Sequence, residues 1–227
     1  MTTIGVVLFP GSNCELDVME AMRSLGADAK VLWHGDRSVG DADAVVVPGG
    51  FAHGDYLRPG AIARFSPIMA AVDKFAGDGG PVVGICNGFQ VLTEAGLLPG
   101  ALQKNRGLKF LCTTVELRVA TTNSVLTNEA EVGQILRVPI NHFEGNYTCS
   151  PETLSRLRDE DRVVLRYVDN PNGAMDDVAG ICNEGRNVVG LMPHPERASN
   201  PLLGSTDGLV LLRSLLVSAG AALSRRG

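Results

Sequence analysis

One cysteine stands between two glycines in the stretch Gly84-Ile85-Cys86-Asn87-Gly88. The apolar residues before it indicate a buried strand, and the residues after it indicate the start of a helix. At such a turn a thiol is presented at the carboxyl edge of a sheet, and the helix N-terminus favours its thiolate form. The stretch has the pattern of the G-x-S-x-G nucleophile elbow, with sulfur in place of oxygen. It predicts that Cys86 is a nucleophile; a small buried packing residue is the alternative.

A base with an orienting carboxylate follows in Pro193-His194-Pro195-Glu196. Residues that precede a proline favour extended backbone, and residues two apart in an extended segment face the same side. We therefore expect His194 and Glu196 to point the same way, so that the carboxylate fixes an imidazole that deprotonates a thiol. Alone, the pair is better interpreted as part of a proline-rich surface turn. Together with the elbow it predicts a catalytic triad of Cys86, His194 and Glu196.

Attack on an acyl group also requires hydrogen-bond donors for the oxyanion. The backbone N–H of Asn87, directly after the nucleophile, is one candidate. The second lies in the stretch VPGGF, where Gly49 and Gly50 follow another strand end and leave backbone amides uncovered. We expect the amides of Gly50 and Asn87 to form the oxyanion hole.

Short β-branched runs alternate with helical patterns in the first half of the chain. Strands are expected at residues 4–9, 30–33, 43–50 and 81–85, with a helix around residues 18–25. A second helix is expected to begin at Ser66-Pro67, because serine is a good N-cap and proline a good first helical residue. The β-α-β-β-α-β order of nearly continuous apolar strands predicts a parallel sheet covered on both faces.

The second half is richer in strands and more irregular. Strand-like runs lie at residues 108–117, 134–140, 162–168 and 187–192. A final helix is expected to bury one face, formed by Leu209, Leu212, Leu216 and Ala219 and flanked by Leu215. Because no linker or repeat interrupts the chain, residues 1–227 are expected to form one α/β domain. Its mostly parallel central sheet carries helices on both faces and a smaller antiparallel excursion.

Composition excludes several kinds of partner and site. The 227 residues include 25 Asp and Glu against 20 Lys and Arg, which argues against a nucleic-acid or anionic-membrane surface. No apolar run approaches the roughly 20 residues that span a bilayer, and the N-terminus lacks the basic region of a signal peptide. Five scattered cysteines without a CxxC pair suit reduced thiols, so a cytoplasmic protein is expected. The four histidines have no metal-ligand spacing, so no metal is expected in this chain.

Three motifs in this order, PGGF, GICNGFQ and PHPE, resemble those of the class I (triad-type) glutamine amidotransferases. The resemblance implies that Cys86 attacks the side-chain amide of glutamine, that His194 transfers the proton and that Glu196 orients His194. It assigns the oxyanion to the amides of Gly50 and Asn87. Ammonia leaves first, and water then releases glutamate from the thioester.

Five longer segments resemble the PurQ-type glutaminase subunits of phosphoribosylformylglycinamidine synthase: FPGSNCELD, GGFAHGDYLRPGAIARFSP, EGNYTCSPETL, DNPNGAMDDVAGICNEGRNVVGLMPHPERA and LLGSTDGL. This resemblance extends from Ile4 to about Leu216. It implies that ammonia passes to a large PurL-type synthetase subunit, with a small PurS-type subunit bridging the two. There, ATP and Mg²⁺ serve the amination of formylglycinamide ribonucleotide to the amidine in purine (IMP) biosynthesis. No cofactor is expected in this chain.

The same resemblance carries over the substrate contacts. Gln90 matches a glutamine after the elbow that contacts substrate, and Phe51 follows the glycine pair. Asn141-His142-Phe143 stands where Ala-His-Gly is more usual, and it is closer to the Asn-His-Gly-Phe loop by which related amidotransferases hold the glutamine backbone. A second departure is His53, at a position where the family commonly has tyrosine.

Two other functions stay open from the sequence. The chain could be a thiol hydrolase or peptidase of a related fold, or a non-catalytic regulatory subunit; Gln90 and the intact triad favour the amidotransferase. Cys14 is either structural or part of a subunit contact, and residues 51–67 are the loop expected to sense the partner. His34 and His53 are expected to be ordinary loop or surface histidines. Cys112, Cys149 and Cys182 are expected to be packing residues.

Overall fold

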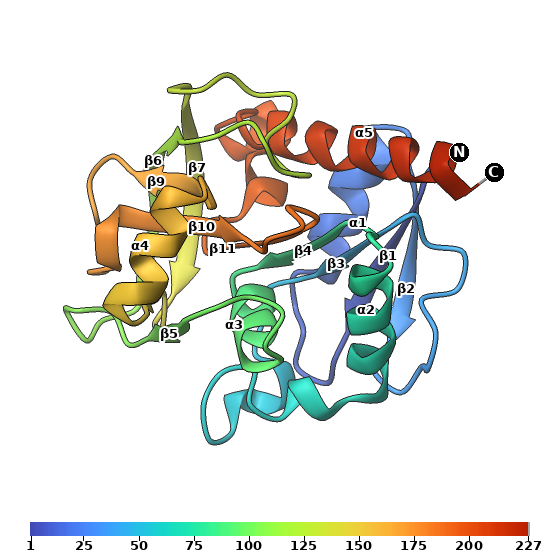
Figure 1. Ribbon diagram of the computed structural model, residues 1–227, viewed down its shortest axis with the longest axis horizontal. Helices are drawn as coiled ribbons and strands as arrows, with labels where there is room; N and C mark the ends of the chain where they lie inside the picture. Colours follow the sequence, from blue (N-terminus) through green and yellow to red (C-terminus); the bar gives the residue numbers. More distant parts are fainter. Residues whose placement is uncertain (227) are drawn as a thin grey trace.

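A nine-stranded sheet runs through the molecule (Figure 1). The computed structural model describes residues 1–226, with side chains described as far as residue 221. In spatial order the strands are β2 (Asp28–Trp33), β1 (Thr3–Leu8), β3 (Ala44–Val47), β4 (Val82–Ile85), β11 (Val188–Leu191), β10 (Val178–Cys182), β9 (Val163–Tyr167), β6 (Leu111–Val119) and β7 (Ile135–His142).

The first five strands in that order form the parallel half of the sheet. β1 pairs in parallel with β2 and β3, and β4 pairs in parallel with β3 and β11. β3, β4 and β11 are buried along their whole length, as expected for strands covered on both faces. Their carboxyl ends meet at one edge of the sheet, which is where open α/β folds bind ligands.

The antiparallel part extends the same sheet. From β11 it continues through β10, β9, β6 and β7, each antiparallel to its neighbour. A separate antiparallel pair is formed by β5 (Ala101–Gln103) and β8 (Asn146–Thr148). The predicted α/β class, a mostly parallel central sheet with an added antiparallel part, is confirmed.

Helices cover the parallel half on both faces, α1 and α5 on one and α2 and α3 on the other (Figure 1). The helices are α1 (Glu15–Ser24), α2 (Pro67–Gly77), α3 (Asn87–Glu94), α4 (Pro151–Asp159) and α5 (Gly208–Arg226). Short 3-10 turns are η1 (Ala52–Asp55), η2 (Ala63–Phe65), η3 (Met175–Asp177), η4 (Pro195–Ala198) and η5 (Pro201–Leu203). No helix in the described part of the chain is long and apolar enough to cross a membrane.

The buried face of α5 differs from the predicted one. Leu212 and Ala219 are buried as expected, but Leu215 lies in the buried face itself, whereas Leu209 and Leu216 are only half-buried. α5 packs against η4 and also contacts β3 and β7. These partners come from distant parts of the chain, so helical spacing alone could not fix the rotation of α5 about its axis.

The predicted start of α2 is confirmed, and one expectation about a cysteine is wrong. Ser66 and Pro67 do stand at the N-cap and first position of α2, but the Ser66 side chain caps no amide. Its hydroxyl instead lies 3.2 Å from Nε2 of His53. Cys112 is exposed on β6 and is not a packing residue, because its position on the strand faces solvent. Of the two other cysteines expected to pack, Cys149 is half-buried and Cys182 is buried.

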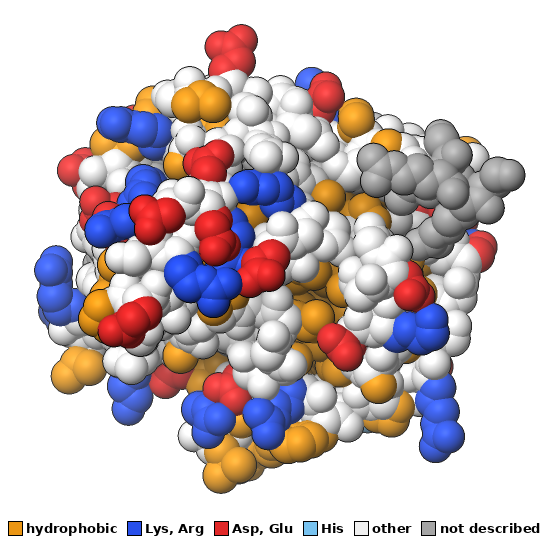
Figure 2. Space-filling view, in the orientation of Figure 1, with side chains coloured by type: hydrophobic (Ala, Val, Ile, Leu, Met, Phe, Trp, Pro, Cys, Tyr) orange, Lys and Arg blue, Asp and Glu red, His pale blue; other side chains and the backbone are white. Residues whose placement is uncertain are grey.

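Polar and apolar surface are distributed unevenly over the molecule. Figure 2 shows charged side chains gathered over the antiparallel half, and hydrophobic side chains at the lower edge, where Figure 1 places η1 and η2. In that segment Tyr56, Leu57 and Phe65 are 73%, 90% and 73% exposed. An apolar surface of this kind on an otherwise polar molecule marks a candidate interaction site.

Candidate active site

The candidate nucleophile lies at a strained turn. Cys86 connects β4 to α3 with φ 51° and ψ −106°, a conformation that residues other than glycine rarely adopt. Glycine is needed on either side of it. A Cβ on Gly88 would overlap the carbonyl oxygen of Val47, and a Cβ on Gly84 would lie 2.7 Å from the carbonyl of Gly88. The elbow therefore forms, and it places Cys86 at the carboxyl edge of the parallel strands.

The candidate base and its carboxylate meet just beyond the end of β11. Nδ1 of His194 lies 2.6 Å from Oε1 of Glu196, and both side chains are almost completely buried. The backbone N–H of His194 donates to the carbonyl of Pro139 on β7 at 2.8 Å, which anchors this segment. Because a carboxylate can only accept, Nδ1 carries the proton, and Nε2 is left to exchange a proton with a thiol.

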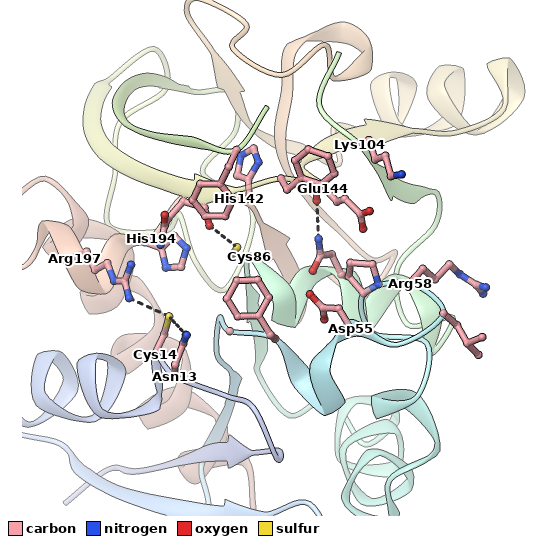
Figure 3. Close-up of a pocket in the computed structure, with 18 residues that line it drawn as sticks. Asn13, Cys14, Asp55, Arg58, Cys86, Lys104, His142, Glu144, His194 and Arg197 are labelled. Atoms are coloured by element: carbon pink, nitrogen blue, oxygen red, sulfur yellow. Dashed lines mark hydrogen bonds between the residues drawn. The ribbon is translucent and has the colours of Figure 1, made fainter. Parts of the chain in front are cut away.

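Three side chains approach the same point beside Gly49. A Cβ on Gly49 would lie 2.8 Å from Cε1 of His194, 3.1 Å from Sγ of Cys14 and 3.5 Å from Cβ of Cys86. Figure 3 shows the His194 ring next to the Cys86 thiol, with Cys14 on another side of the ring. The structure thus brings together the three predicted triad residues, although they come from segments far apart in the sequence.

The thiol of Cys86 is directed toward a backbone carbonyl in this conformation. It donates to the oxygen of Asn141, 3.7 Å away (Figure 3). Nε2 of His194 is buried and has no hydrogen-bond partner among the described residues. The thiol therefore has to rotate before its proton can pass to His194.

Electrostatics favour a charged imidazole at this position. Burial lowers the pKa of His194, but the charges of Glu196 and Cys86 outweigh burial and hold that pKa well above its ordinary value. An imidazolium beside a thiol stabilises the thiolate, which is the nucleophilic form.

The oxyanion-hole candidates are two backbone N–H groups that have no hydrogen-bond acceptor in the described part of the chain. Asn87 is the first residue of α3, so its N–H has no intrahelical acceptor. The amide of Gly50 donates no hydrogen bond within the described part of the chain. Gly50 has φ 142°, and a Cβ there would lie 2.8 Å from Cα of Ser12. The loop after β1 holds this segment in place, because the N–H of Phe51 donates to the carbonyl of Gly11 at 2.9 Å.

These groups face a cavity of about 430 Å³ (Figure 3). Its volume is within the range of small-molecule sites. All six of the predicted oxyanion and substrate-contact residues other than Asn87 line it: Gly50, Phe51, Gln90, Asn141, His142 and Phe143. Five charged residues that the sequence did not single out also line it: Asp55, Arg58, Lys104, Glu144 and Arg197. These five lie in loops or short 3-10 turns, where charge is common, so no pattern marks them as part of a site.

The side chain of Asn87 is buried and bonded within the protein. Its Oδ1 accepts from the N–H of Ala52 at 3.0 Å, and its Nδ2 donates to Asp55 and Gln90 at 3.1 and 2.9 Å. Nε2 of Gln90 in turn donates to the carbonyl of Glu144 at 2.6 Å. Asn87 and Gln90 thus connect the elbow to two walls of the cavity. Contact between Gln90 and substrate stays a prediction.

The protonation of His142 follows from its neighbour Asn105. The Asn105 side chain donates to the carbonyls of Lys109 and His142, so its Oδ1 is the atom that accepts. That oxygen accepts from the N–H of Gly145 and lies 3.1 Å from Nδ1 of His142. His142 therefore carries its proton on Nδ1. Burial and the charge of His194 lower the pKa of His142 to about 4, so the ring is neutral at physiological pH.

One carboxyl group in the wall changes charge near neutrality. Burial raises the pKa of Asp55 to about 6, although the hydrogen bond from Asn87 acts in the opposite sense, and the charge of Glu144 adds to the rise. Asp55 is the last residue of η1 and directly precedes the exposed apolar side chains of Tyr56 and Leu57.

Cys14 and Arg197 form a part of the site that sequence analysis did not predict. Cys14 is 2% exposed and lines the cavity, a position that neither a structural role nor a subunit contact implied. Nη2 of Arg197 donates to its sulfur at 3.2 Å (Figure 3), while Nε of Arg197 donates to Asp17 at 3.1 Å. No motif links Cys14 to the elbow. His34 and His53 were expected to be loop residues, and they lie half-buried with their rings 5.4 Å apart.

Known proteins resemble nearly the whole chain. The family described as the CobB/CobQ-like glutamine amidotransferase domain matches residues 2–206. A Rubrobacter xylanophilus protein named phosphoribosylformylglycinamidine synthase subunit PurQ is 58% identical over 95% of this chain and 98% of its own length. A protein of the same name from Koribacter versatilis is 55% identical over 93% of this chain and 96% of its own length.

A solved structure also resembles the fold over nearly the whole chain. It is described as the structure of PurLQS from Thermotoga maritima, and one of its chains is 41% identical to this one. The two superpose with a TM-score of 0.88, covering 95% of this chain and 98% of the other.

Proposed function

This chain belongs to the PurQ family of phosphoribosylformylglycinamidine synthase subunits, within the CobB/CobQ-like glutamine amidotransferases. We propose that it hydrolyses glutamine by way of a thioester on Cys86. The chain is the glutaminase subunit of that synthase. We assign the catalytic roles to Cys86, His194 and Glu196. The observation that carries the assignment is the buried 2.6 Å contact between His194 and Glu196, directly beside the strained Cys86 turn.

The first step is attack of the sulfur on the substrate amide. Sγ of Cys86 forms a bond to the side-chain carbonyl carbon of glutamine, and the thiol proton passes to Nε2 of His194. Glu196 holds the Nδ1–H and stabilises the imidazolium, which agrees with the raised pKa of His194. The amides of Gly50 and Asn87 donate to the oxyanion of the tetrahedral intermediate.

The second step releases ammonia, and the third releases glutamate. As the tetrahedral intermediate collapses, the C–N bond breaks and His194 returns its proton to the leaving nitrogen. Glutamate then remains bound to Cys86 as a thioester. A water molecule attacks this thioester while His194 accepts its proton. The C–S bond breaks and the thiol is reprotonated, so glutamine and water have become glutamate and ammonia.

The charged wall of the cavity supports a free amino acid as substrate. Glutamine carries an α-ammonium and an α-carboxylate, and each needs a partner of opposite charge or a hydrogen bond when it leaves water. Groups of both signs line the cavity: Asp55 and Glu144, and Arg58 and Lys104. We assign the remaining backbone contacts of glutamine to Asn141, His142 and Phe143.

The ammonia is used by partner subunits. We propose that a large PurL-type synthetase subunit receives it, with a PurS-type subunit bridging, and converts formylglycinamide ribonucleotide to formylglycinamidine ribonucleotide in purine biosynthesis. ATP and Mg²⁺ belong to that partner. The assembly described as PurLQS supports this arrangement. We further propose a cytoplasmic location and a single domain over residues 1–227, of which residue 227 lies outside the described residues.

Segment 51–67 is the candidate contact with the synthetase. It combines exposed apolar residues with residues of the cavity wall, Phe51 and Leu57 among them. It is also bonded to the elbow, because Asn87 contacts both Ala52 and Asp55. A partner that binds this segment can therefore influence the geometry at Cys86.

Covalent labelling tests the assignment of the nucleophile. The assembled complex is incubated with the glutamine analogue diazo-oxonorleucine, and the modified residue is identified by peptide mass spectrometry. We expect an adduct on Cys86 that excess glutamine prevents, with the exposed thiol of Cys112 unmodified as the internal control. An active complex that acquires no adduct at Cys86 would favour a thiol hydrolase of another specificity, and a complex without any glutaminase activity would favour a regulatory subunit.

A further inference from the structure

A second thiol lies beside the base, and no step of glutamine hydrolysis uses it. Sγ of Cys14, one ring nitrogen of His194 and one carboxylate oxygen of Glu196 lie within 4.8 Å of one another, and all three residues are buried. Cys86 approaches the same place, since Sγ of Cys14 and Cβ of Cys86 lie 3.1 and 3.5 Å from one point beside Gly49. Figure 3 shows both sulfur atoms next to the His194 ring.

The imidazole beside these thiols has a ring nitrogen open to a ligand in the described conformation. Nε2 of His194 has no hydrogen-bond partner in the described part of the chain, although the side chain is only 1% exposed. Buried polar atoms are almost always partnered, so an unpartnered one indicates a group that the site can accept. Two thiol sulfurs and one imidazole nitrogen are a donor set that Zn²⁺ takes in tetrahedral sites.

We propose that Sγ of Cys14, Sγ of Cys86 and Nε2 of His194 form a reversible inhibitory site for a thiophilic divalent cation, Zn²⁺ being the best match. The proposal rests on the proposed function, because the cation occupies the nucleophile and the base of that same site. With the thiolate and the imidazole lone pair both bound to the cation, neither can act on glutamine. A water molecule takes the fourth position, on the cavity side.

The geometry requires a small movement of Cys14 or His194 and a rotation of the Cys86 thiol. Zn–S and Zn–N bonds of about 2.3 and 2.0 Å place tetrahedral ligand atoms roughly 3.5–4 Å apart. The Cys14 and His194 ligand atoms lie within 4.8 Å, so a shift of about 1 Å suffices. The Cys86 thiol has to leave the carbonyl of Asn141, the same rotation that catalysis requires. Glu196 at Nδ1 completes the carboxylate–histidine–zinc arrangement, which fixes the ring and raises its basicity.

The charge of Arg197 limits the affinity of the site for a cation. The guanidinium of Arg197 lies 3.2 Å from Sγ of Cys14, and its charge opposes a cation there. Removing that charge should therefore strengthen cation binding, whereas removing the Cys14 sulfur should weaken it.

Direct metal binding tests the site on the full-length chain. Co²⁺ is titrated under anaerobic conditions and thiolate-to-metal charge-transfer absorption is recorded; Zn²⁺ is then added as competitor. We expect strong absorption that Zn²⁺ abolishes. Cys14→Ser should weaken binding by about 100-fold and Arg197→Gln should tighten it by about tenfold. Cys112→Ser removes an exposed thiol on β6 and is the matched control, expected to bind as the unaltered chain does.

Glutaminase assays of the complex complete the test, with each variant compared to its own metal-free rate. We expect Zn²⁺ to inhibit the unaltered complex, a chelator to restore it, and Cys14→Ser to need about 100-fold more Zn²⁺. Equal affinities for Cys14→Ser and the unaltered chain would overturn the proposal, as would inhibition reversed by a thiol reductant but not by a chelator. The absorption titration needs no turnover. Absence of glutaminase activity before metal is added would instead contradict the proposed function.

Discussion

The carboxylate of Glu196 lies 2.6 Å from Nδ1 of His194, and both side chains are enclosed almost completely by protein. In such surroundings water cannot screen the carboxylate, so its charge acts directly on the ring. Glu196 therefore fixes both the orientation of His194 and its readiness to hold a proton. This buried pair is the feature of the site that a surface turn of the same sequence would lack.

Replacing Glu196 by Gln tests the contribution of that charge. The amide keeps the shape of the side chain but no longer stabilises an imidazolium, so glutamine-dependent turnover should fall by about 10²- to 10⁴-fold. Steady-state glutamine hydrolysis by the complex measures the loss. Glu184→Gln is the control, because Glu184 is an exposed carboxylate that pairs with Arg156, and it should have no effect. A loss below about threefold for Glu196→Gln would exclude an essential role.

The elbow should not tolerate a side chain at Gly88. A Cβ there overlaps the carbonyl of Val47 on the neighbouring strand, so Gly88→Ala should destabilise the fold by about 2–4 kcal/mol. Gly77→Ala is the matched control: no atom lies within 4 Å of its added Cβ, and the position is the helical end of α2. It should be neutral or stabilising by up to about 1 kcal/mol. Urea unfolding of both variants measures the difference, and equal stability would contradict the close approach.

His142 should make the fold sensitive to acid. Its pKa is lowered from 6.5 to about 4, so the folded state binds this proton less readily than the unfolded state does. The stability that follows is complete above pH 6.5 and is lost as the pH falls toward about 4, a change on the order of 3 kcal/mol. Urea unfolding across this range should show that His142→Asn loses less stability than the unaltered protein. Parallel curves for the two would contradict a buried neutral ring.

The exposed apolar segment should contribute to partner binding. Phe65 is 73% exposed, and Phe65→Asp should weaken association with the synthetase by at least about tenfold. Val132, 68% exposed in the turn between β6 and β7, provides the control, and Val132→Asp should bind normally. Titration of labelled synthetase measures both affinities. Unchanged binding by Phe65→Asp would mean that the partner docks elsewhere.

Much of the site could be predicted because its signals are local. The turn at Cys86 depends on glycines within two residues, and His194 and Glu196 are only two residues apart. The extended segment expected from the prolines is wrong for Glu196, which lies in the 3-10 turn η4, although the two side chains do meet. The order of strands and helices then implied one sheet edge for all three. Residue types and short spacing were enough to predict the three triad residues, because each motif lies within a few residues of the end of one strand.

The remaining features depend on contacts between distant segments. Cys14 lies next to His194 because the segments that follow β1 and β11 both pass Gly49, at the carboxyl end of β3. No sequence motif predicts this contact. Asn105 fixes the tautomer of His142 from a separate loop. The pKa of Asp55 reflects burial beside Glu144, which appears only once the cavity is formed. Such properties arise from packing, and a sequence pattern carries no trace of them.

The most direct measurement of the central claim compares two nitrogen sources in one assembled complex. With Cys86→Ala in the glutaminase subunit, amidine formation should be abolished with glutamine as the donor and stay at the unaltered rate with ammonium salts, because only the thiolate step is removed. Glutamine-dependent synthesis that persists in this variant would contradict Cys86 as the nucleophile. So would an equal loss of both activities in a complex that assembles normally.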